Sequence, residues 1–108
     1  MKINEEEKQR IQDGIVEMLK TVFDPEMPVD IYNLGLVYRI DVDDEANVDI
    51  DMTLTAPTCP IADFIVEDAR QKVASVDGVQ DVKVNLVWEP QWETDMMSDE
   101  AKLDLGML

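Results

Sequence analysis

Apolar residues recur with a helical period in two parts of this chain, and the first of them predicts an N-terminal helix. They follow one another every three or four positions from Ile11 to Val22, as on one face of an amphipathic helix. Asn4 and Glu7 have the spacing of a capping box, so the helix is expected over residues 5–22. It must end before Pro25, because proline disfavours helical geometry in the residue before it.

Alternating apolar and polar residues then predict an antiparallel hairpin with one buried and one solvated face. The residues expected to share the buried face of the first strand are Leu36, Tyr38, Ile40 and Val42. Those of the second strand are Val48, Ile50, Met52 and Leu54, and residues 44–47 supply the turn. The acidic residues between them are predicted to form the solvated face, which accounts for them more simply than a metal site does.

A second helix and a third strand complete the pattern. A helical stripe runs from Ile61 to Val76 and ends at Gly78, and alternation resumes from Val82 to Trp88. A strand, a helix and a strand with tight connections predict two parallel strands. The order helix, strand, strand, helix, strand predicts a single α+β domain over residues 1–108. It has a small mixed three-stranded sheet, helices packed on one face and an irregular C-terminal tail with a last short helix capped by Ser98 or Asp99.

The composition excludes several classes of function. The chain has 25 acidic and 9 basic residues and a net charge of −16, which opposes binding to nucleic acid or to an anionic membrane surface. No run of about 18 apolar residues is present, so no membrane span is expected. The single cysteine cannot form an internal disulfide, and a cytoplasmic location is therefore expected.

That cysteine, Cys59, is the main candidate for chemistry. It precedes Pro60, which favours the first position of a helix, so the thiol is predicted at the helix N-cap, where the dipole stabilises a thiolate. The alternative is a buried structural cysteine. Thr53 and Thr55 alternate onto one face leading to Cys59, where their hydroxyls could bind a ligand or simply suit a strand. Carboxylates from Asp24 and Glu26 could lie near the thiol, or could serve only the turn that ends the first helix.

The remaining residues limit what this thiol can do. The chain has no histidine, which excludes a Cys/His pair and a Ser/His/Asp triad. One cysteine cannot hold zinc or an iron–sulfur cluster alone. No stably bound cofactor is therefore expected, and metal at Cys59 would be transient iron or a cluster shared with a partner or across a homodimer. Trp88 and Trp92 could close over the sheet or form a partner-binding patch.

Three segments resemble one known family in order and in sequence: residues 24–26 (DPE), 29–38 (VDIYNLGLVY) and 52–60 (MTLTAPTCP). Residues 88–92 (WEPQW) and 100–106 are similar to its closing motifs. The family is that of the SufT/PaaD-like (MIP-type) proteins of iron–sulfur cluster assembly. The resemblance implies a small α+β fold, an accessory role in maturing iron–sulfur proteins, and contacts with the assembly machinery and with apo client proteins. It also implies that Cys59 is the family's reactive cysteine and that Asp24 and Glu26 match its acidic motif.

The sequence departs from the family pattern at a few positions. Thr58 stands where many relatives have glycine, and Glu89 and Gln91 stand where threonine and proline are common. The cysteine-bearing extension of the PaaD branch is absent, which favours the SufT-like branch. The first hypothesis is a carrier or adaptor in iron–sulfur protein maturation that acts through Cys59. The alternatives are a cysteine-independent adaptor that binds through the tail and a thiol-exchange enzyme, which the missing histidine and resolving cysteine disfavour.

Overall fold

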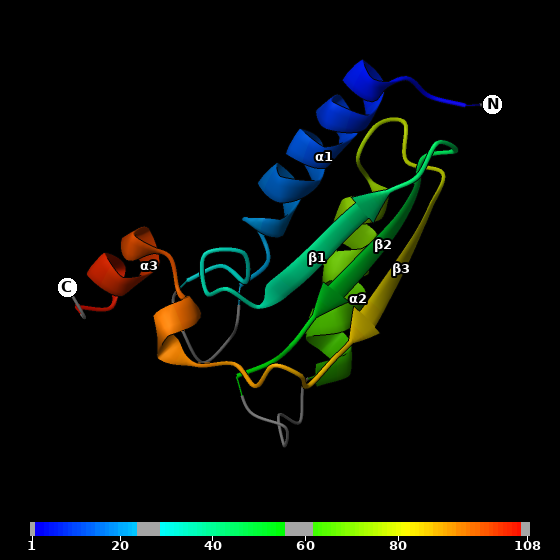
Figure 1. Cartoon of the computed structure of the whole chain (residues 1–108). Coiled ribbons are helices and arrows are strands. Elements are labelled where there is room, and N and C mark those ends of the chain that lie inside the picture. Colours follow the sequence, from blue (N-terminus) through cyan, green and yellow to red (C-terminus); the bar gives the residue numbers. More distant parts are fainter. Residues whose placement is uncertain (1, 24–28, 56–61, 107–108) are drawn as a thin grey trace.

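The structure, a computed structural model, describes residues 2–23, 29–55 and 62–106. The predictions for Asp24, Glu26, Cys59 and Pro60 therefore lie outside the described residues. The elements, in chain order, are α1 (Glu5–Leu19), β1 (Val37–Val42), β2 (Asn47–Met52), α2 (Ala62–Ala74), β3 (Asp81–Leu86), the 3-10 helix η1 (Thr94–Met96) and α3 (Asp99–Asp104) (Figure 1).

The sheet has the predicted mixed topology. Its strand order is β1-β2-β3, with β1 antiparallel to β2 and β2 parallel to β3. The helices α1 and α2 pack on one face of this sheet, and no α-helix of the described residues covers the other, open face (Figure 1). The α+β fold predicted from the two hydrophobic periods is confirmed.

The core lies between the helices and the covered face of the sheet. α1 contributes Ile11, Ile15 and Leu19, each at most 1% exposed. Burying one such side chain completely contributes about 1.5–3 kcal/mol, so packing rather than helix propensity holds α1 in place. The Asn4 side chain accepts a hydrogen bond of 2.8 Å from the Glu7 amide, which confirms the predicted N-cap. α1 ends earlier than predicted, at Leu19, although Val22 in the following turn is still buried.

One prediction about the hairpin is wrong. Leu36, Ile40 and Val42 do face the core, but Tyr38 does not, because the register of β1 shifts between Val37 and Arg39. An extra residue in one strand moves the following side chain to the other face. Val37 takes the inward place instead, and the Tyr38 hydroxyl donates a hydrogen bond of 2.7 Å to the Pro90 carbonyl oxygen.

The C-terminal tail is more ordered than the sequence predicted, because it folds back on the loop before β1. Ser98 caps α3, accepting from the Ala101 amide at 3.1 Å, as predicted. The Ser98 amide donates to the Asn33 carbonyl oxygen at 2.8 Å. Gly35 (φ +80°) lies so close to the tail that a Cβ atom there would be 2.3 Å from the carbonyl oxygen of Met96. The loop before β1, which contains Asn33 and Gly35, is therefore the surface on which the tail packs.

Among the described residues, no helix combines the length and the apolar character that crossing a bilayer requires.

Candidate functional site

A cavity of about 230 Å³ lies beyond the carboxyl ends of β2 and β3. Four of the residues singled out in the sequence line it: Thr53, Thr55, Trp88 and Trp92. The structure therefore brings together two pairs of residues that are more than thirty positions apart in the chain.

The parallel pairing of β2 and β3 explains this arrangement. Parallel strands end at the same edge of a sheet, so the residues after Met52 lie beside those after Leu86. Two backbone hydrogen bonds fix this edge: the Val87 amide donates to the Met52 carbonyl oxygen, and the Thr53 amide donates to that of Leu36, both at 2.8 Å. Ligands commonly bind beyond the carboxyl ends of parallel strands.

Thr53 is the most unusual residue of the cavity. It is only 1% exposed, and its Oγ1 atom has no hydrogen-bond partner among the described residues. A buried polar group left without a partner costs about 1–3 kcal/mol, so such groups are rare. Thr53 is one of the residues that line the cavity, so its hydroxyl is a candidate hydrogen-bond partner for a ligand there.

The two tryptophans play different parts. The indole nitrogen of Trp92 donates a hydrogen bond of 2.7 Å to the Leu34 carbonyl oxygen, and its ring packs against the core. Trp92 therefore closes the sheet end, which was one of the two alternatives drawn from the sequence. Trp88 is 42% exposed, so it presents apolar surface to solvent at the same cavity.

Two further residues at the cavity were given no role from the sequence. Glu89 and Gln91 also line it, and both are exposed. The sequence signals for them were their position beside the tryptophans and their departure from the family pattern. Glu89 supplies the only carboxylate among the described residues that line the cavity.

Cys59 follows Thr55 by four positions, and the description resumes three positions after it, at Ala62. Within residues 2–23, 29–55 and 62–106, no group of three or more His, Cys, Asp or Glu residues is placed to hold a metal ion. The thiol of Cys59 and the carboxylates of Asp24 and Glu26 lie outside the described residues, and their roles stay predictions.

The carboxylates of the hairpin lie on the open face of the sheet, as predicted. Arg39 bridges two of them, donating to Asp49 at 2.8 Å and to Asp51 at 3.0 Å, and Asn85 donates to the same two residues. The hydrogen bonds from Arg39 hold the pKa of both carboxyl groups below the usual value. The same bonds raise the pKa of the Arg39 guanidinium. This network ties all three strands together on the solvated face.

The sequence comparisons fit this architecture. A family model described as iron–sulfur cluster assembly protein matches residues 12–86, and the chain belongs to this family. A protein of Porphyromonas gingivalis named Fe-S protein maturation auxiliary factor is 58% identical over 97 residues, which are 90% of this chain and 92% of that one. The Fe-S protein maturation auxiliary factor SufT of Staphylococcus aureus is 48% identical over 86 residues, or 80% of this chain and 98% of that protein. The resemblance seen in the motifs is confirmed.

Two solved structures share the fold. The crystal structure of a domain of unknown function from Bacillus anthracis superposes with a TM-score of 0.88 at 39% sequence identity, covering 97% of this chain and 100% of that one. A conserved hypothetical protein from Thermotoga maritima has a TM-score of 0.75 at 37% identity, with 97% and 96% of the two chains covered.

Proposed function

We propose that this protein is a cytoplasmic accessory factor in the maturation of iron–sulfur proteins, a carrier or adaptor rather than a turnover enzyme, with Cys59 as its reactive thiol. The observation that carries the proposal is the cavity at the ends of β2 and β3, which Thr53, Thr55, Trp88 and Trp92 line. Four extended residues span at most about 14 Å, so this cavity is within reach of the chain segment that carries the cysteine. Membership of the iron–sulfur cluster assembly family supports the same assignment.

In this proposal the cavity residues support the sulfur chemistry. The Thr53 hydroxyl donates a hydrogen bond to a sulfur atom of the cargo or of the thiolate, which favours the charged form. The cargo is iron or an iron–sulfur cluster, and it stays only briefly. One cysteine and no histidine cannot complete its coordination, so a partner or a second copy supplies the remaining ligands.

The exposed Trp88 favours a second function of the same surface. A large aromatic side chain that is 42% exposed beside a cavity is typical of a contact site for another protein. We propose that Trp88 contacts the assembly machinery or an apo client protein. If this contact alone were sufficient, the protein would be a cysteine-independent adaptor.

Gene replacement in the native host separates these functions. Strains carrying Cys59→Ser, Thr53→Val or Trp88→Ala are compared with the deletion strain at equal protein level. The assays measure aconitase and other cluster-dependent enzymes under iron limitation. The carrier function predicts that Cys59→Ser falls to the deletion level and that Thr53→Val gives a smaller loss. Loss with Trp88→Ala and full activity with Cys59→Ser would establish the adaptor instead. If the deletion lowers none of these activities, the maturation function is wrong.

A further inference from the structure

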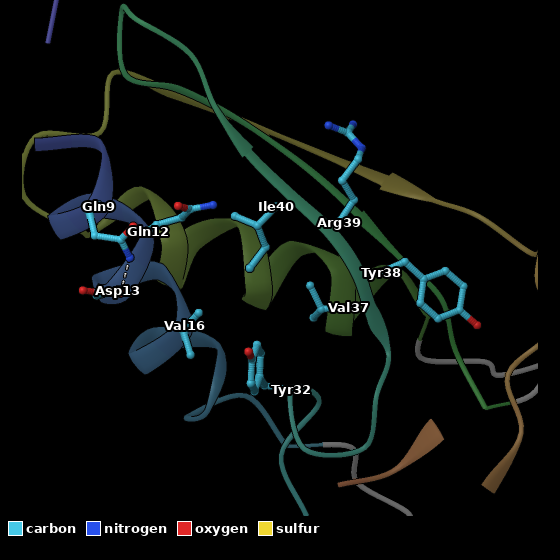
Figure 2. Close-up of a pocket in the computed structure, with 9 residues that line it drawn as sticks. All are labelled: Gln9, Gln12, Asp13, Val16, Tyr32, Val37, Tyr38, Arg39 and Ile40. Atoms are coloured by element: carbon cyan, nitrogen blue, oxygen red, sulfur yellow. Dashed lines mark hydrogen bonds between the residues drawn. The ribbon is translucent and has the colours of Figure 1, made fainter. Parts of the chain in front are cut away.

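A second surface, on the opposite side of β1 from β2, has the features of a peptide-binding groove. The groove measures about 340 Å³ and runs between α1 and the outer edge of β1. Figure 2 shows Val16 of α1 and Val37 and Ile40 of β1 directed into it, with Tyr32 at one end. Gln9, Gln12 and Asp13 line the same groove from α1, and none of its lining residues belongs to the Thr53 cavity.

Along this groove the backbone of β1 has no partner strand in the part of the chain that the structure describes. β1 is an edge strand, and no described strand pairs with its outer side. In an antiparallel pair, successive residues direct their N–H and C=O groups alternately toward and away from the partner strand. The Asp43 amide donates to the Asn47 carbonyl oxygen, so the backbone N–H and C=O groups of residues 41 and 39 also point toward β2. The backbone groups of Ile40 therefore point outward, away from β2. The backbone groups of Ile40 are thus available to an added strand.

The charges around this edge determine the kind of strand that fits. Arg39 is the only cation of the described residues that line the groove, and Asp49 and Asp51 already bind it. Asp41, on the open face of the same strand, is exposed and lies 4.0 Å from Arg39. Asp13 adds a further carboxylate from α1. Lys20, whose ammonium lies 5.7 Å from the centre of the Tyr32 ring, is itself 4.0 Å from the carboxylate of Glu17. The charge left uncompensated beside the groove is therefore negative, in a chain whose net charge is −16.

We propose that the groove binds an extended basic segment of a partner protein, which adds a fourth strand to the edge of β1. Alternate side chains of such a strand point to opposite faces of the sheet. Apolar side chains on one face pack over Val16, Val37 and Ile40, and lysine or arginine side chains on the other face lie opposite Asp41. The bulge between Val37 and Arg39 limits regular pairing to the following residues, so the bound segment is short. Backbone bonds supply affinity, and the alternation supplies specificity.

The test uses the synthetic peptide acetyl-KVKVKV-amide and the whole ¹⁵N-labelled protein at about 0.15 M salt, where attraction between distant charges is largely screened. The expected result is saturable amide shifts along β1 with slower hydrogen exchange at Ile40, and no shift at Thr53. The peptide acetyl-KKKVVV-amide has the same composition without alternation and should bind more weakly. Equal binding of the two peptides, or an absence of shifts along β1, would overturn the proposal.

Two charge variants of equal size distinguish local from general attraction. Asp41→Lys should weaken binding of the alternating peptide by about two- to fivefold, the range expected for one cross-strand pair. Asp81→Lys makes the same charge change on β3, at the far edge of the sheet, and should leave the dissociation constant unchanged. Equal weakening by both variants would mean nonspecific attraction and would also overturn the proposal. Because this groove shares no lining residue with the Thr53 cavity, either result leaves the maturation function open to its own test.

Discussion

Replacement of Gly35 by alanine tests whether the C-terminal tail is an integral part of the fold. Gly35 has a φ of +80°, and an added Cβ atom would lie 2.3 Å from the carbonyl oxygen and 2.8 Å from the carbonyl carbon of Met96. Both contacts are with backbone, which cannot rotate away as a side chain can. The variant must therefore displace the tail or distort the turn before β1.

The structure allows an estimate of the cost. A left-handed conformation at alanine costs about 1–2 kcal/mol. Displacing the tail also breaks the hydrogen bonds from Trp92 to Leu34 and from Tyr38 to Pro90, each 2.7 Å long. Each such bond contributes about 1 kcal/mol net, so the expected loss of unfolding free energy is about 3–4 kcal/mol. A domain of this size has only about 5–15 kcal/mol in total.

The assay is urea unfolding followed by circular dichroism and by the fluorescence of the two tail tryptophans. Gly106→Ala is the matched control, because Gly106 has a φ of +73° but an added Cβ would have no atom of another described residue within 4 Å. The control variant should lose at most about 1–2 kcal/mol of unfolding free energy, and the fluorescence spectrum of its native state should be unchanged. Gly35→Ala should shift the native fluorescence to the red as Trp92 becomes exposed. If the two variants lose equal stability and keep the wild-type spectrum, the inferred tail packing is wrong.

Three further predictions follow from single contacts. Arg39→Met should lower the free energy of unfolding at neutral pH, because Arg39 holds the native pKa of Asp49 and Asp51 below the ordinary 3.8. The difference in unfolding free energy from wild type should narrow as the pH falls below that value, which acid titrations of stability measure. Thr53→Val should leave urea stability equal or raise it by up to about 1 kcal/mol, because it removes an unpaired buried hydroxyl, and a loss above 1 kcal/mol would mean that the hydroxyl is paired. Trp92→Phe should lose about 1 kcal/mol in the same assay, whereas Trp88→Phe, at an exposed ring, should lose almost none.

Much of the cavity could be anticipated from local pattern. The alternation around Thr53 and Thr55 and the parallel pairing implied by a strand, a helix and a strand place the ends of β2 and β3 together. Trp88 follows the second of these strands, so its proximity to Thr53 is a consequence of topology. The groove beside β1 could not be anticipated in this way, because it depends on how α1 lies across the sheet and not on any short motif.

The sequence by itself determined the elements, their order, the mixed sheet and the family, because hydrophobic period and motif order are properties of the chain. Only the tertiary structure decided the facing of Tyr38, since a bulge changes the register without changing the pattern of residues. It also decided that Gly35 must stay small and that the Thr53 hydroxyl finds no partner among the described residues. Each of these three features depends on whether a residue distant in sequence places an atom nearby. Such contacts exist only once the chain has packed.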